Sequence, residues 1–196
     1  MCGIYGEVSL APGLRPNREA VARSGSAIVH RGPDDNDLHV TDRVALGLRR
    51  LSIIDVSGGR QPLFNEDRSV AVVCNGEIYN FRELRAALTS AGHSFRTGSD
   101  AEVLVHLYEE HGDNFVTKLR GMFGFALWDE HRQRLLLGRD RLGIKPVYYA
   151  PMNGSVAFAS ESKGLLERGD IEARLDPRAL EDYLALGYVP NPHSLF

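Results

Sequence analysis

The chain has 196 residues, 43% hydrophobic and 25% charged, a composition typical of one globular domain with a buried core. Its formal net charge of -3, with acidic and basic residues interspersed, gives no electrostatic basis for binding nucleic acid or a membrane surface. It has no apolar stretch long enough to span a membrane and no signal-peptide pattern, so we expect a cytoplasmic protein whose cysteines, Cys2 and Cys74, are free thiols.

The first half of the chain is rich in strand patterns. Alternating apolar and small residues predict a strand over residues 2–10. A helix is predicted over 17–29, and it ends before the loop HRGPDD at 30–35. Three more strands are predicted at 38–42, 43–55 and 68–80.

Two capping patterns begin helices in the middle of the chain. Asn80 with Glu83 predicts a capping box, and Gly92 can end that helix. Its buried face is expected to comprise Phe81, Leu84, Leu88 and Ala91. Ser99 with Glu102 predicts a second capping box and a second helix.

Strands return in the second half and are expected to form a meander, covered on both faces. They are predicted at 121–129, 134–140, 146–151 and 156–160. Asp176 as N-cap and Pro177 at the first position then begin a last helix, which ends at Gly187. Its inward residues are expected to be Leu180, Tyr183 and Leu184. Interleaved strands and helices without a long linker predict a single α+β unit.

Cys2 stands directly behind Met1, and this position suggests chemistry. If Met1 is removed, Cys2 carries a thiol and a free α-amine on the same Cα. An α-amine has a reference pKa of roughly 8 and a thiol one of about 8.5, so the amine can take the thiol proton near neutral pH. The alternative is that Cys2 is a small apolar residue that begins a buried strand.

Asn75 and Gly76 allow two interpretations. Asn-Gly after a strand is typical of a hairpin turn, because both residues tolerate positive φ. An Asn side-chain amide next to a glycine N–H can also supply two converging donors, as an oxyanion hole requires.

Charged residues complete the set. Arg50 is either a solvated surface charge or a planar clamp for a carboxylate. Asp100 in the first turn of a helix can complement the helix dipole or, together with Glu77, hold an ammonium group. A nucleophile, two donors, a cation and two anions suit a substrate with an α-carboxylate, an α-ammonium and a neutral amide, and glutamine has these groups.

Seven motifs, in this order, resemble the glutaminase domain of glutamine-dependent asparagine synthetases, which are class II glutamine amidotransferases. They are MCGI, HRGPD, RLSIID, NGEIYN, TGSDAE, GMFGFALWD and GRDRLGIKPVYY. The resemblance covers residues 1–196 as one domain. It implies the four-layer αββα sandwich of N-terminal nucleophile hydrolases, with two mainly antiparallel sheets between helix layers.

The resemblance also implies roles for individual residues. Cys2 would be the nucleophile with its own α-amine as base and acid, and Asn75 and Gly76 would form the oxyanion hole. Arg50 would bind the glutamine α-carboxylate. The pocket would be lined by Leu51, Ser52, Ile53 and Ile54, and the α-ammonium would be held by Glu77 and Asp100.

Two other motifs are interpreted as structural. HRGPD is expected to position the site. In GRDRLGIKP we expect a turn built by Gly143 and Pro146, and an internal pair between Arg139 and Asp140.

In the family an ATP-using synthetase domain with a Ser-Gly-Gly-x-Asp-Ser phosphate loop follows, and these 196 residues contain no such loop. We therefore expect no metal and no cofactor for the glutaminase half, and ATP and magnesium only in a synthetase domain or partner chain that accepts the ammonia. Whether the chain is a fragment or free-standing stays open, and a homo-oligomer is one option for its assembly.

Three alternatives remain at this stage. The chain could be the glutaminase half of another class II amidotransferase, although RLSIID favours the asparagine synthetase branch. Another amine-nucleophile hydrolase would cleave amides other than glutamine, which a substrate panel would reveal. A non-catalytic module would bind glutamine without releasing ammonia.

Overall fold

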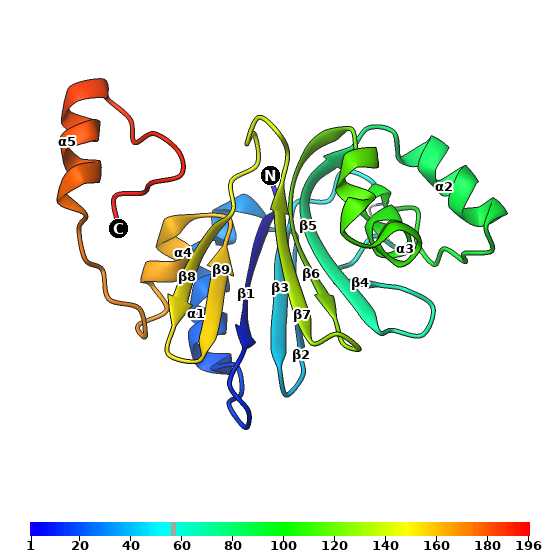
Figure 1. The fold of residues 1–196 in the computed structure, drawn as a ribbon, viewed down its shortest axis with the longest axis horizontal. Helices are drawn as coiled ribbons and strands as arrows, with labels where there is room; N and C mark the ends of the chain where they lie inside the picture. The colour runs from blue at the N-terminus through cyan, green and yellow to red at the C-terminus, as the bar shows by residue number, and fades with distance from the viewer. Residues whose placement is uncertain (56–57) are drawn as a thin grey trace.

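Two antiparallel β-sheets lie face to face in the computed structural model, which describes residues 1–55 and 58–196 (Figure 1). The strands are β1 (Gly3–Ser9), β2 (Asp35–Val40), β3 (Val44–Arg50), β4 (Leu63–Phe64), β5 (Val70–Ile78), β6 (Gly121–Asp129), β7 (Arg134–Arg139), β8 (Tyr148–Met152) and β9 (Ser155–Ala159). One sheet has the order β2-β3-β1-β9-β8 and the other β4-β5-β6-β7.

Helices cover the outer face of each sheet. Their bounds are α1 (Arg18–Ala27), η1 (Val29–Arg31), α2 (Phe81–Ser90), η2 (Asp100–Glu102), α3 (Val103–His111), η3 (Gly112–Lys118), α4 (Ser162–Leu166) and α5 (Pro177–Leu186). Helices α1 and α4 pack on the five-stranded sheet, and α2 and α3 lie on the side of the four-stranded sheet (Figure 1). In the described part of the chain no helix combines the length and apolarity that a bilayer span requires.

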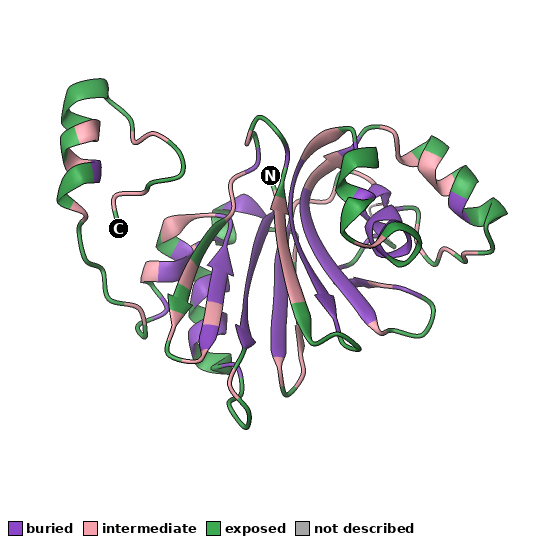
Figure 2. Ribbon diagram, in the orientation of Figure 1, coloured by how far each residue is buried: buried purple, intermediate pink, exposed green. Residues whose placement is uncertain are grey.

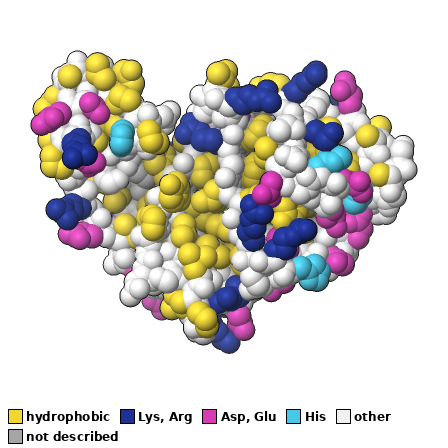
Figure 3. Space-filling model, viewed as in Figure 1, with side chains coloured by type: hydrophobic (Ala, Val, Ile, Leu, Met, Phe, Trp, Pro, Cys, Tyr) yellow, Lys and Arg dark blue, Asp and Glu magenta, His cyan; other side chains and the backbone are white. Residues whose placement is uncertain are grey.

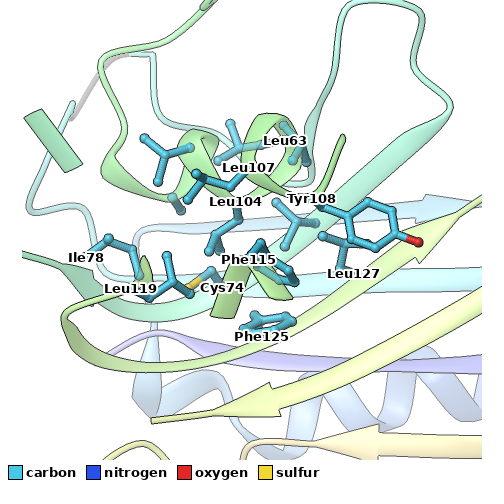
Figure 4. Packing of buried hydrophobic residues seen from close by; sticks show 14 of the residues in the cluster. Leu63, Cys74, Ile78, Leu104, Leu107, Tyr108, Phe115, Leu119, Phe125 and Leu127 are labelled. Atoms are coloured by element: carbon cyan, nitrogen blue, oxygen red, sulfur yellow. The ribbon is translucent and has the colours of Figure 1, made fainter. Parts of the chain in front are cut away.

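Three layers of buried side chains hold the sandwich together. Buried residues run along most strands of both sheets (Figure 2). The layer between the sheets includes Ile4, Val8, Leu46, Leu48, Val73, Trp128 and Phe158. The layer under α1 and α4 includes Tyr5, Val21, Ile28 and Leu165. The layer between α3 and the four-stranded sheet includes Leu104, Leu107, Phe115, Phe125 and Leu127 (Figure 4). Burial of each such large apolar side chain stabilises the fold by about 1.5–3 kcal/mol. The two sheets between helix layers confirm the predicted αββα architecture.

The predicted meander is wrong, because its four strands divide between the sheets. β6 and β7 pair in the four-stranded sheet, whereas β8 pairs with β9 in the other. β9 also pairs with β1, so the second hairpin completes the sheet that begins at the N-terminus. The segment between β7 and β8 therefore crosses from one sheet to the other.

The strand predicted over 43–55 is too long. β3 ends at Arg50, and the residues that follow it leave the sheet as a loop. Its neighbour β2 ends its pairing with β3 at the same place, since Asp35 lies opposite Arg50. Without a partner strand the chain is free to turn toward the end of the sandwich.

Helix starts were predicted with mixed success. The side chain of Asp176 caps α5 by accepting from Arg178 N at 2.9 Å, as predicted. The capping box of Asn80 is wrong, because its side chain bonds Lys118 O and Arg120 N instead of the helix. Ser99 caps η2 by accepting from Ala101 N, whereas Glu102 bonds the backbone of the preceding loop.

The predicted face of α2 is confirmed except at its end, since Leu88 is buried and Phe81 and Leu84 pack against the core, whereas Ala91 is exposed. The predicted face of α5 is wrong. In α5, Tyr183 is 47% and Leu184 76% exposed, and only Ala179 is buried. Helix α5 stands at one end of the molecule (Figure 1). Periodicity identifies residues that share a face, but it does not show whether another element covers that face.

Candidate active site

A cavity of about 140 Å³ opens beside the N-terminus of β1. Its lining comes from both sheets, from the loop after β3 and from η2. Nine of the residues predicted for the site line it: Cys2, Arg50, Leu51, Ile53, Ile54, Asn75, Gly76, Glu77 and Asp100. Segments far apart in the sequence thus meet at one cavity.

Cys2 is held in place from two sides. Leu51 N lies 3.3 Å from Cys2 Sγ, and Sγ lies 3.5 Å from Leu51 O. On the other side Arg31 Nε donates to Cys2 O at 2.8 Å. Arg31 is itself fixed by Glu161, which accepts from its Nη1 at 2.8 Å. The HRGPD loop therefore contacts the Cys2 backbone, as expected of a positioning segment.

Ser52 is the one predicted pocket residue that is not among the described residues lining the cavity. Its N–H donates to Asp34 Oδ2 at 2.8 Å, so this part of the loop is tied to HRGPD. The role of Ser52 in the pocket stays a prediction, whereas its neighbours Leu51, Ile53 and Ile54 reach the cavity.

Asn75 and Gly76 lie inside β5, paired with Gly124 and Phe123. The hairpin interpretation is therefore wrong. Gly76 has a φ of 140°, and a Cβ there would collide with the carbonyl oxygen of Met122. The site requires glycine at this position because of the close strand contact.

The amide of Asn75 has an unused donor. Asn75 is 1% exposed, and Nδ2 has no hydrogen-bond partner within residues 1–55 and 58–196. A buried donor without a partner costs about 1–3 kcal/mol. A ligand oxygen in the cavity would satisfy it.

Arg50 lies at the end of β3, with its guanidinium fixed by the loop that follows. Nη2 donates to Ile54 O at 3.1 Å and to Asp55 O at 2.7 Å. Arg50 is buried, and its Nη2 lies close to the backbone of Gly59. A positive charge is thereby held at the cavity wall, where a carboxylate can bind.

Two acids, Glu77 and Asp100, also line the cavity. Asp100 is buried, and its Oδ2 accepts from Ile78 N at 2.7 Å. Burial raises the pKa of Asp100, the bond from Ile78 opposes this, and the charge of Glu77 raises it further. A bound cation would relieve this repulsion, so the pair suits an ammonium group.

Lys145 lines the cavity and was missed as a site residue. It is 5% exposed, and Nζ lies 3.1 Å from Met1 Sδ. The sequence places it in GRDRLGIKP, which we interpreted as a structural turn. Its position near the cavity depends on the crossing between the sheets, which no local pattern reveals.

The turn contains Gly143, as predicted, with a φ of 66°, and the side chain of Asp140 holds it in place. Its carboxylate accepts from the backbone N–H groups of Phe123, Leu142, Ile144 and Lys145. The predicted pair with Arg139 is wrong, because that guanidinium bonds the carbonyl of Gly143. The acid thus fixes the backbone on both sides of Gly143.

The other missed lining residues include Gln61. Its side chain pairs with the backbone of Cys74 through hydrogen bonds of 2.7 Å and 3.2 Å, extending the edge of β5.

Cys74, the second cysteine at the cavity, is buried. Burial raises the pKa of its thiol well above the ordinary value, so this cysteine is a poor nucleophile.

Known proteins match the chain along its whole length. A family model described as a glutamine amidotransferase domain matches residues 1–196. The chain is 42% identical over 198 residues to asparagine synthetase (glutamine-hydrolyzing) 1 of Bacillus subtilis (strain 168), covering 100% of the chain and 31% of that protein. It is 46% identical over 166 residues to asparagine synthetase (glutamine-hydrolyzing) 3 of Arabidopsis thaliana, covering 84% of the chain and 28% of that protein.

A solved structure shares the fold. The glutamine phosphoribosylpyrophosphate amidotransferase from B. subtilis, complexed with ADP and GMP, superposes with a TM-score of 0.69 at 21% identity. The match covers 90% of this chain and 46% of that one.

Proposed function

Because the chain belongs to the glutamine amidotransferase domain family, we propose that it hydrolyses the side-chain amide of L-glutamine to glutamate and ammonia. The observation that carries the proposal is the buried Asn75 Nδ2, which lacks a hydrogen-bond partner in the described structure and shares a cavity with Cys2. A donor held ready in this way stabilises the negative oxygen that forms when a thiolate attacks an amide.

The proposed binding mode uses the charged residues that line the cavity. Arg50 takes the α-carboxylate of glutamine, and Asp100 with Glu77 takes the α-ammonium. The cavity of about 140 Å³ is well below the roughly 300–1,000 Å³ of pockets for drug-sized ligands, which fits an amino acid.

The proposed reaction proceeds in two steps at Cys2. The α-amine takes the thiol proton, and Sγ attacks the amide carbon, so its carbonyl oxygen becomes an oxyanion bonded by Asn75 Nδ2 and Gly76 N–H. The protonated amine then gives its proton to the leaving nitrogen, the C–N bond of the tetrahedral intermediate breaks, and ammonia departs, leaving a thioester on Cys2. Water hydrolyses the thioester and releases glutamate. These steps require no cofactor.

Removal of Met1 is part of the proposal. With Met1 attached, the nitrogen of Cys2 is a peptide amide and cannot act as a base. Met1 also lines the cavity, where its sulfur contacts Lys145. Trimming would thus expose the base and open space beside the nucleophile.

The chain spans 31% of the length of the B. subtilis relative and 28% of the A. thaliana one. We propose that residues 1–196 are a glutaminase domain whose ammonia is used in asparagine synthesis from aspartate. The acceptor would be an ATP- and magnesium-dependent synthetase unit, in the same protein or in a partner. A cytoplasmic location follows from the need to keep the Cys2 thiol reduced.

A paired assay tests the proposal. Chain shown by mass spectrometry to lack Met1 should convert glutamine to equal amounts of glutamate and ammonia, with no ATP added. Chain that keeps Met1 should be nearly inactive. Full activity with Met1 retained would refute the amine-base mechanism.

A substrate panel separates this function from its alternatives. Glutamine should be cleaved in strong preference to N-acyl amides and to glutamine lacking its α-carboxylate or α-ammonium. Equal cleavage of those amides would contradict the role given to Arg50 and Asp100. Glutamine binding without ammonia release would instead identify a non-catalytic module.

A further inference from the structure

Four side chains converge at a second place, away from the cavity. Glu66 lies in the turn between β4 and β5, His93 follows α2, and His106 and Glu109 come from α3. One ligand atom from each lies within 4.8 Å of all the others. None of the four belongs to the lining given for the substrate cavity. Acidic and histidine side chains gather over this end of the molecule (Figure 3).

His106 is the central observation. It is 0% exposed, and neither of its ring nitrogens makes a hydrogen bond with any described residue. Nδ1 nevertheless lies 3.3 Å from Glu66 Oε2 and 3.4 Å from Glu109 Oε2. Nδ1 carries either a proton, which both carboxylates attract, or a lone pair, which needs a cation between it and the two carboxylates.

The separations suit a metal ion. A tetrahedral site with ligands at about 2.0–2.1 Å has ligand atoms roughly 3.3–3.4 Å apart. His106 Nδ1 lies 3.3 Å from Glu66 Oε2 and 3.4 Å from Glu109 Oε2, and His93 Nδ1 lies 3.2 Å from Oε1, the other oxygen of Glu66. One ligand atom from each residue lies within 4.8 Å of all the others, so the side chains must move closer together to reach the tetrahedral spacing. His93 Nδ1 lies 3.8 Å from Glu109 Oε2, slightly beyond that spacing.

Outer contacts orient two of the ligands, as they do in known metal sites. The second nitrogen of His93, Nε2, lies 3.2 Å from Glu110 Oε1, whereas His106 Nε2 lies 4.0 Å from Glu102 Oε1, too far for a hydrogen bond. The free oxygen of Glu109 accepts from Asn65 Nδ2 at 2.8 Å.

The local charge also favours a cation. The salt bridges that described residues give to Glu66 and Glu109 involve only His93 and His106. The nearest arginines act elsewhere, since Arg85 approaches Glu102 and Arg96 bonds the carbonyl of Glu66. The cluster is therefore balanced either by protonated histidines or by a metal ion.

We propose that Glu66, His93, His106 and Glu109 form a binding site for a divalent metal ion of the zinc class. Imidazole and carboxylate ligands together suit Zn²⁺ better than Mg²⁺ or Ca²⁺, which prefer oxygen alone. Four protein ligands make it a structural site. The ion joins the turn after β4, the loop after α2 and helix α3, whose preceding turn carries Asp100.

The test measures zinc binding rather than activity. A Cys2→Ala chain, which removes a competing thiol, is treated with chelator and titrated with Zn²⁺ by calorimetry. A single Zn²⁺ should bind per chain, and native mass spectrometry should show the same stoichiometry. Co²⁺ in its place should give the visible absorption of a four-coordinate ion. Absence of stoichiometric Zn²⁺ binding would refute the site and indicate an ion-paired cluster.

Substitutions of single residues test whether the four proposed ligands bind the Zn²⁺ ion. Glu109→Gln and His93→Gln, which keep side-chain size at partly accessible positions, should abolish stoichiometric binding. Glu110→Gln, which alters only an outer contact, should weaken binding by about 10–100-fold. The controls Glu83→Gln and His111→Gln, exposed on α2 and α3, should bind as the parent does. Unchanged binding by Glu109→Gln and His93→Gln, or weakening by the controls to the same extent, would overturn the assignment.

Discussion

The cavity at Cys2 and the cluster of Glu66, His93, His106 and Glu109 each contain a buried polar side chain with at least one hydrogen-bonding atom that has no partner in the described structure. At the cavity this atom is Asn75 Nδ2, a donor, and a ligand must bring it a negative oxygen. In the cluster the unused atoms are the ring nitrogens of His106, which face carboxylates and call for a cation. The unused atom thus indicates the charge of the partner.

Substitution of the nucleophile should separate the two regions most completely. Cys2→Ala removes the thiol that forms the thioester, so glutamine hydrolysis should fall to background. The fold and Zn²⁺ binding should be unchanged, because Cys2 lies outside the cluster. Ammonia release and zinc calorimetry on one preparation measure both. Residual hydrolysis near the parental rate would show that another group attacks.

Loss of the unused donor should have the next largest effect. Asn75→Ala should lower kcat by about 10²–10³-fold with little change in KM, because the oxyanion exists only in the transition state. Steady-state kinetics with glutamine measures this. A change confined to KM would contradict the assignment of Asn75 to the oxyanion hole.

Substitution of the charged residues that line the cavity should mainly weaken glutamine binding. Arg50→Ala and Asp100→Asn each remove a charge-assisted contact worth about 1.5–3 kcal/mol, so KM should rise about 10- to 150-fold. Circular dichroism checks the fold, because both side chains also bond backbone groups. An equal fall of kcat in both variants, at unchanged KM, would contradict a binding role.

The smallest effect is expected for Asp140, in the turn that leads to Lys145, whose substitution should change the stability of the fold and not catalysis. Burial alone would raise the pKa of Asp140, but four backbone N–H bonds outweigh it and hold the pKa below its ordinary value. Its stabilisation is therefore full above the unfolded-state value of about 3.9 and is lost as the pH falls through the lower folded-state value.

Asp140→Asn should accordingly lower the free energy of unfolding at neutral pH by about 1–3 kcal/mol, so the variant should unfold at a lower urea concentration than the parent. The difference from the parent should narrow as the pH falls below about 4. A difference that stays constant down to strongly acidic pH would show that the charge of Asp140 contributes nothing.

The sequence by itself determined whatever depends on neighbouring residues. Asp176 and Pro177 begin α5 because a cap and a fixed φ act within one turn. The seven motifs, in their order along the chain, also predicted the family and the αββα fold. For the same reason the set of candidate site residues could be assembled without coordinates, since each motif brings its own side-chain chemistry.

Only the tertiary structure decided how segments distant in the chain meet. Gly76 lies within a strand because β6 packs closely against it, and Leu184 is exposed because no described element covers its face. Lys145 reaches the cavity because the segment that carries it crosses from one sheet to the other. The sequence predicted no metal, because His93 and His106 gain their shared neighbours only when a turn, a loop and a helix pack together. Such contacts follow from long-range packing, on which local patterns carry no information.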